Sequence, residues 1–200
     1  MKIMMLYFVL AFALGAHAST GSISKSRASA KIQDLRDFLN TTGNIYIYSE
    51  SLQQSLDYLY EDASTEDEIA DEMCTQYRPH MLAKDDYLLN MTYMLGSTWS
   101  SKNIYAKLGE SRPGGRSYMN ESTTYGGTGT KLLLRVYDKK AGCIFFRYLY
   151  GTRRCCETHV LEAKVASYNT ITGDKCRKYT KKYCEDDVYT TYNDNCKRQP

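Results

Sequence analysis

The sequence predicts a mainly β protein in which short antiparallel strands form a meander that closes on itself. The strand-like segments are separated by close turns at 84–86 and 138–142, and the chain contains 19 tyrosines, a residue type common in strands. Seven cysteines indicate that disulfides stabilise the domain. The expected strands are 74–82, 87–95, 103–108, 131–138, 143–150 and 156–165. Short strands with close turns are typical of a small closed barrel.

The N-terminus has the pattern of a secretory signal peptide. Lys2 precedes an apolar stretch over 3–16, and small residues occupy the −3 and −1 positions in Ala16-His17-Ala18. This apolar run is too short to span a bilayer, which disfavours a membrane anchor. We therefore expect a signal peptide at 1–18 and one secreted, extracellular domain at 19–200.

Composition and motifs exclude several function classes. A formal net charge of +3 is too small to predict nucleic-acid binding, and no later segment is apolar for long enough to cross a membrane. Nucleophile-elbow, zinc-protease and phosphate-loop motifs are absent, so an enzyme is only the third choice. The cysteines form no CxxC pair and only His80 and His159 could assist them, so neither a metal nor a cofactor is expected.

All seven cysteines follow the signal peptide, and in a secreted chain they should be oxidised. Because the number is odd, one is left without a partner. Three sequons, at Asn40, Asn90 and Asn120, predict glycosylation and fit passage through a secretory pathway.

The flanking segments complete the expected organisation. Apolar residues at helical spacing predict a short helix over 24–40, and alternation predicts a strand over 44–48. The acidic stretch 61–72 is interpreted as a solvated connection. A second helix is expected over 175–184, with Thr172 or Asp174 as its N-cap, before a last short strand over 188–192.

The order of the cysteines carries a family resemblance. One cysteine precedes a hairpin, two open successive strands, two lie in a late helix and one follows Tyr192 near the C-terminus. Together with Asp34-Leu35-Arg36-Asp37-Phe38-Leu39-Asn40-Thr41-Thr42 and the following Ile45-Tyr46-Ile47-Tyr48, this order resembles the salivary lipocalins of ticks, including the histamine-binding proteins. The resemblance implies an eight-stranded antiparallel lipocalin barrel with a short N-terminal helix and a C-terminal helix packed outside.

The same resemblance implies a disulfide pairing. It implies Cys74–Cys196 and Cys143–Cys176, and the remaining spacing suggests Cys156–Cys184. Cys155 would then be free or bonded to another molecule, which includes a link between two chains. The assignment of Cys155 rather than Cys156 as the unpaired cysteine stays open at this point, and a monomer is the expected state.

Period-two alternation then predicts which side chains line the barrel. A glycan on Asn90 must point outward, and cysteines bonded to an external helix must also point outward. The expected inward residues are Tyr87, Leu89, Met91, Tyr93, Leu95, Ile144, Phe146, Tyr148, Tyr150, Glu157, His159 and Leu161. These constraints predict an aromatic lumen that holds one carboxylate and one imidazole.

An inward glutamate has two interpretations, because a buried charge is costly without a partner. Glu157 either pairs with an inward arginine, with His159 or with a tyrosine and fixes the core, or it meets a cationic ligand. The resemblance implies the second role, since an acidic residue on this strand contacts the amine in the family's amine binders. The ligand-contacting residues expected are Glu157, His159, Tyr87, Met91, Tyr93, Phe146 and Tyr148.

The predicted function is sequestration of a small host mediator, with histamine or serotonin first, to suppress inflammation or haemostasis. One alternative ligand is a lipid mediator such as a fatty acid or leukotriene. Another alternative is inhibition of a host protein, in immunity or complement, through surface loops that include 51–73.

Overall fold

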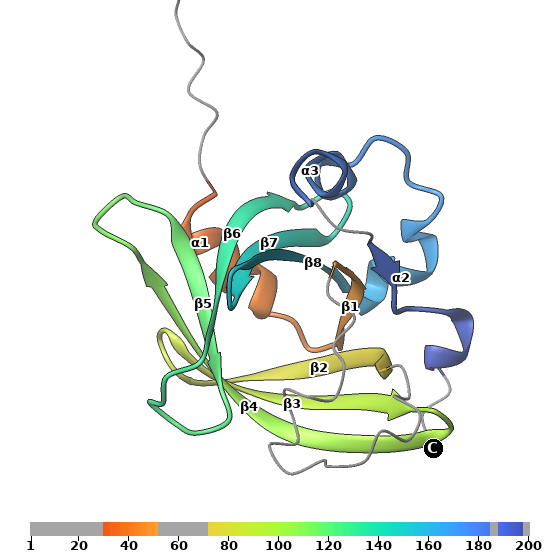
Figure 1. Cartoon of the computed structure of the whole chain (residues 1–200), viewed down its shortest axis with the longest axis horizontal. Coiled ribbons are helices and arrows are strands. Elements are labelled where there is room, and N and C mark those ends of the chain that lie inside the picture. Colours follow the sequence, from red (N-terminus) through yellow and green to blue (C-terminus); the bar gives the residue numbers. More distant parts are fainter. Residues whose placement is uncertain (1–29, 52–71, 185–187, 198–200) are drawn as a thin grey trace, which may run out of the picture.

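The computed structural model describes residues 30–51, 72–184 and 188–197, and in it eight strands form a closed antiparallel barrel (Figure 1). Neighbouring strands pair in the order β2 to β8, then β1, and an additional β1–β2 pairing closes the ring. The strands are β1 (Ile45–Glu50), β2 (Glu72–Ala83), β3 (Asp86–Leu95), β4 (Thr98–Glu110), β5 (Ser117–Ser122), β6 (Thr130–Asp138), β7 (Cys143–Tyr150) and β8 (Arg153–Leu161). The short β9 (Tyr189–Thr190) pairs with the end of β1. The expected signal peptide lies outside the described residues, and so does the acidic stretch except for Glu72, at which β2 begins.

Alternation along the strands divides the buried side chains into an inner and an outer cluster. The inner cluster fills the barrel and draws on every barrel strand. Its members on β3, β7 and β8 include Tyr87, Leu89, Met91, Tyr93, Ile144, Phe146, Tyr148 and Cys155. The outer cluster lies between the barrel wall and the C-terminal segments, and it contains all six bonded cysteines or packs against them.

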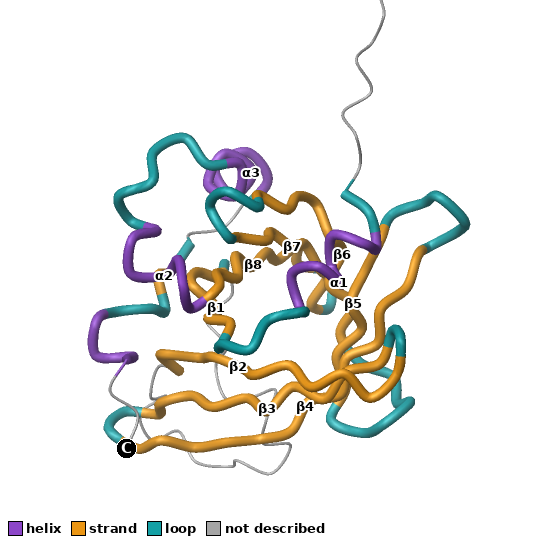
Figure 2. The backbone as a smooth tube through the Cα atoms, turned by 180° about the vertical axis from the view of Figure 1, so that it is seen from behind, coloured by secondary structure: helices purple, strands orange, loops and turns teal. Residues whose placement is uncertain are grey.

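Helix α1 (Ile32–Leu39) packs at one end of the barrel, where Figure 2 shows it close to β5 and β6. Its residues Leu35, Phe38 and Leu39 are buried in the inner cluster, because their spacing places them on one helical face. The opposite face forms ion pairs with two hairpin turns: Arg36 with Asp85 at 2.7 Å, and Asp37 with Lys139 at 2.7 Å. The helix therefore closes the end at which these turns lie.

Helices α2 (Glu162–Tyr168) and α3 (Lys175–Tyr183) lie outside the barrel, with α3 against β6, β7 and β8 (Figure 1). Disulfides join Cys143 on β7 and Cys156 on β8 to Cys176 and Cys184 at α3. A third disulfide joins Cys74 on β2 to Cys196 in the 3-10 helix η2 (Asp194–Lys197). These are the three pairs that the family resemblance implies, and the cysteine left over is Cys155.

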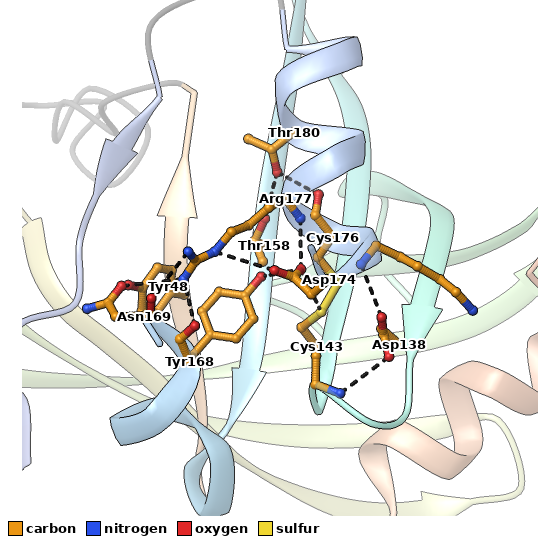
Figure 3. A network of polar contacts seen from close by, with 12 residues as sticks. Tyr48, Asp138, Cys143, Thr158, Tyr168, Asn169, Asp174, Cys176, Arg177 and Thr180 are labelled. Carbon is orange, nitrogen blue, oxygen red and sulfur yellow. Dashed lines mark hydrogen bonds and ion pairs between the residues drawn. A yellow bond between two sulfur atoms is a disulfide. The ribbon is translucent and has the colours of Figure 1, made fainter. Parts of the chain in front are cut away.

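A buried aspartate fixes the start of α3 (Figure 3). Asp174 is the N-cap, and its Oδ1 accepts hydrogen bonds from the Arg177 backbone N–H at 2.9 Å and from the Tyr168 hydroxyl at 3.0 Å. The Arg177 guanidinium also donates to the Tyr168 carbonyl at 2.7 Å. Of the two caps that the sequence left open, Asp174 is therefore the one used, and it also connects α3 to α2.

Several elements differ from the expectation. The N-terminal helix begins at Ile32 within the described residues, and the last strand is limited to β9. The chain leaves the barrel after Leu161 and forms α2, so the expected strand over 156–165 is four residues too long. Strand β5 was not predicted at all, because Ser117–Ser122 carries too few apolar residues to alternate visibly.

Candidate functional site

A chain of three buried polar side chains crosses the interior between β2 and β8. The Tyr77 hydroxyl lies 2.8 Å from His159 Nδ1, and His159 Nε2 lies 2.8 Å from Glu157 Oε2. A neutral imidazole with its proton on Nε2 satisfies both contacts, because Nε2–H then donates to the carboxylate and Nδ1 accepts from the tyrosine. Of the interpretations given for Glu157, its pairing with His159 is thus present in the structure.

Glu121 on β5 is a second interior carboxyl, and sequence reasoning missed it. Glu121 lies two residues after the inward-facing Met119, on the same face of the strand. It also pairs in register with the inward-facing Ala106 of β4. Its Oε1 is buried and has no hydrogen-bond partner among the described residues. Desolvation and then the negative charge of Glu157 raise the pKa of Glu121 to about 8, while Lys102 acts in the opposite direction.

Glu50 at the end of β1 brings a third carboxyl to the same side of the barrel wall. A register shift between Ile47 and Ser49 changes the parity of β1, so that Glu50 lies directly opposite Glu157 on β8. Paired residues on adjacent strands share a face, so Glu50 faces inward with Glu157. The pKa of Tyr148 is raised by burial, then by Glu157 and Glu50, which places this tyrosine beside the carboxyls.

Aromatic rings surround the polar chain. The centroid of the Phe146 ring lies 5.0 Å from that of His159, and the Tyr77 centroid lies 5.6 Å from the same imidazole. Further along the wall, the Lys102 ammonium lies 4.8 Å from the centre of the Tyr93 ring. The Tyr148 hydroxyl is buried and has no hydrogen-bond partner among the described residues. Lys102 pairs in register with the inward-facing Met91, so the interior offers one ammonium group beside its anionic, aromatic and hydroxyl groups.

The seven residues expected to contact a ligand all lie in the interior, although not in one place. Glu157, His159 and Phe146 contact one another, and Tyr148 is close to Glu157. Tyr87, Met91 and Tyr93 line β3 in the inner cluster. Tyr150, expected to face inward, is 37% exposed at the end of β7. The expectation of a single interior carboxylate was wrong, because β5 was unrecognised and β1 changes parity.

Cys155 faces the interior and has only 1% of its surface exposed. This position contradicts a disulfide to a second chain, because no external thiol reaches a side chain inside the wall. We expect the native protein to react at under one thiol per ten chains with an aromatic disulfide reagent, and at one thiol per chain in urea. Rapid labelling of the native protein would show instead that the interior opens readily. The disulfides stay intact in both measurements, so Cys155 alone is counted.

Two further observations concern metals and membranes. Cys143, Asp174 and Cys176 lie close enough to share an ion, but the two sulfurs are joined in a disulfide, which leaves Asp174 as the sole ligand of that group. No helix in the described ranges is long and apolar enough to cross a membrane.

Comparison with known proteins gives a match at the level of the fold. No family model matches the sequence, and no curated protein matches it. Among solved structures, the chain is similar to Japanin from the tick Rhipicephalus appendiculatus, in a crystal form bound to cholesterol. The match has a TM-score of 0.51 and 14% identity, and it covers 78% of this chain and 96% of Japanin. The closed eight-stranded barrel, with a short N-terminal helix and C-terminal helices outside, is a lipocalin fold.

Proposed function

We propose that this protein is a secreted lipocalin that sequesters a small biogenic amine, histamine or serotonin, inside its barrel. The observation that carries the proposal is the Glu121 carboxyl, whose buried Oε1 has no hydrogen-bond partner among the described residues and which lies within the field of Glu157. An ammonium group would supply both a hydrogen bond and a countercharge at this position. The assignment to tick saliva, and to suppression of inflammation or haemostasis, follows the family resemblance and the fold.

The surroundings of Glu121 support a flat cationic ligand. Tyr77 is close enough to both Glu121 and Glu157 for their charges to raise its pKa, after burial as the main cause. Phe146 contacts the imidazole of the same group, and aromatic faces attract cations as well as flat rings. Glu157, already held by His159, then adds negative potential, and Glu121 is the better candidate for the direct anchor.

Amine binding should release a proton. With a pKa of about 8, Glu121 is mostly protonated at pH 6.5 in the free protein. An ammonium ligand favours the ionised carboxylate, so the pKa of Glu121 falls on binding and its proton leaves. A neutral ligand has no such effect, which makes proton release a signature of the proposed chemistry.

The experiment is calorimetric titration of histamine and serotonin at pH 6.5, in two buffers with different ionisation enthalpies. For the wild type we expect binding of at least one amine, with a heat that depends on the buffer. In Glu121→Gln the affinity should fall about ten- to a hundredfold, equivalent to about 1.5–3 kcal/mol. The buffer dependence should vanish for serotonin, which carries no group that titrates near this pH, whereas the imidazole of histamine exchanges protons of its own. Asp194→Asn, at an exposed carboxyl outside the barrel, is the matched control. Failure of both amines to bind the wild type would contradict the proposal.

A lipid is the second candidate, favoured by the Japanin structure with cholesterol bound and by the apolar wall around Leu89, Ile104 and Leu134. A protonated Glu121 would donate a hydrogen bond to a sterol hydroxyl. Cholesterol binding to the wild type and to Glu121→Gln with similar affinity, and with no buffer-dependent heat, would replace the amine proposal with this one.

A further inference from the structure

A cavity of about 150 Å³ lies beside the sequon at Asn120, where the β5–β6 loop folds back over β4 and β5. Asn120 and Lys107 lie directly opposite each other in the β4–β5 ladder, next to the inward pair of Met119 and Leu108. Alternation therefore turns Asn120 and Lys107 to the outside of the barrel. The cavity is lined by Asp86, Tyr87, Tyr105, Ala106, Lys107, Asn120, Ser122, Thr124, Tyr125, Gly126 and Gly127.

The β5–β6 loop turns at glycines beside the cavity. Gly126 has a φ of +70°, which an L side chain rarely adopts, and a Cβ there would meet nothing within 4 Å. Two contacts hold the turn around it: the Thr124 N–H donates to Ser122 Oγ at 3.2 Å, and the Gly127 N–H donates to the Thr124 carbonyl at 3.0 Å. The glycines contribute no side chain that would fill the space.

Aromatic and polar groups line the cavity together. Tyr105 and Tyr125 form an edge-to-face pair with ring centroids 5.6 Å apart, and Tyr125 is 65% exposed despite its size. Lys107 and Asp86, which form an ion pair at 3.5 Å, supply polar groups. A sugar suits such a site, because its C–H face packs on an aromatic ring while its hydroxyl and amide groups make hydrogen bonds.

Two of the three sequons, at Asn120 and Asn90, differ in their surroundings. The Asn120 carboxamide makes no hydrogen bond to a described residue and lines the cavity. Asn90, in contrast, is exposed on β3, and its Nδ2 donates to Asn103 Oδ1 at 2.7 Å. We propose that the cavity beside Tyr125 seats the first N-acetylglucosamine of a glycan on Asn120, so that this sugar becomes a structural part of the β5–β6 loop.

The test uses secreted protein from insect cells with the substitutions Asn40→Gln and Asn90→Gln, so that only Asn120 can carry a glycan. Peptide mapping measures its occupancy. One sample is trimmed by an endoglycosidase to a single N-acetylglucosamine, and Asn120→Gln in the same background carries none. We expect the trimmed protein to melt about 2–4 °C above the glycan-free variant, a shift typical of one modest interaction in a domain of this size.

Tyr125→Ala is the decisive variant, because it removes the exposed ring and leaves the sequon unchanged. In this variant the trimmed and glycan-free proteins should melt at the same temperature. A protein with Asn40 as its only sequon provides the matched control, because Asn40 is exposed and lies outside the cavity. In it, trimming to one sugar and removal by Asn40→Gln should give equal melting temperatures. Three results would overturn the proposal. They are an Asn120 that carries no glycan, equal melting temperatures of the trimmed and glycan-free proteins when Tyr125 is unchanged, and a difference between these two proteins that persists in Tyr125→Ala.

Discussion

The free energy of unfolding of the wild type is expected to fall between about pH 4.5 and pH 8, and Glu121→Gln is expected to remove most of this fall. The folded-state pKa of about 8 lies above the ordinary value of 4.5, so the folded protein holds a proton in this window that the unfolded chain has lost. Stability therefore decreases as the pH rises through the window and levels off above it. Over the window the wild type should lose about 2–4 kcal/mol relative to the variant, after a discount for the partial exposure of the residue.

Urea unfolding at pH 5, 6, 7, 8 and 9 measures this difference. Glutamine keeps the size of the protonated acid and cannot ionise, so the two proteins should be closest at pH 5 and furthest apart at pH 9. Asp194→Asn, which changes an exposed carboxyl, should follow the wild type at every pH. Parallel profiles for wild type and Glu121→Gln would mean that Glu121 ionises as an ordinary surface acid.

His159→Leu is expected to cost about 3–5 kcal/mol of unfolding free energy, because it leaves the Glu157 carboxylate buried with its Oε2 unpaired. The Tyr77 hydroxyl also loses its contact with Nδ1. Thermal and urea unfolding both measure the loss. The single change Glu157→Gln should cost less, since the amide oxygen still accepts a hydrogen bond from His159 and no charge is stranded.

The double variant His159→Leu with Glu157→Gln separates charge from packing. It should be more stable than His159→Leu alone, because Glu157→Gln removes the buried, unpaired carboxylate charge. If the double variant is equally unstable, the imidazole contributes through packing against Phe146 and Tyr77, and the hydrogen bond to Glu157 has little weight.

Strand orientation could be predicted from the sequence wherever a side chain had to point outward. The sequon at Asn90 fixes one residue, and the pairing that the family resemblance and the cysteine spacing suggest fixes Cys143 and Cys156. The period of two then orients each whole strand. Tyr87, Phe146, Glu157 and His159 were placed inside correctly by this argument. The role of these residues in ligand binding stays a prediction.

Glu121 and Glu50 also face the interior, but no neighbouring sequon or bonded cysteine revealed the orientation of their side chains in the sequence. Glu121 lies inside a sequon, Asn120-Glu121-Ser122, and within a strand whose polar residues hide its alternation, so no strand was predicted there. Glu50 depends on the register shift in β1, which changes the side-chain parity after Ile47. A bulge costs little in the ladder and leaves no signal in residue type, so only the strand pairing reveals it.

The disulfide between Cys74 and Cys196 determines what happens when a protease cleaves the chain. It joins residues 122 positions apart, and the β3–β4, β4–β5, β5–β6 and β7–β8 turns all lie between them. A single cut at any of these turns, which are the exposed places where proteases act, leaves one fragment with Cys74 and the other with Cys196. The two fragments stay covalently tethered, and the paired strands can hold the barrel closed after the chain itself has been cleaved.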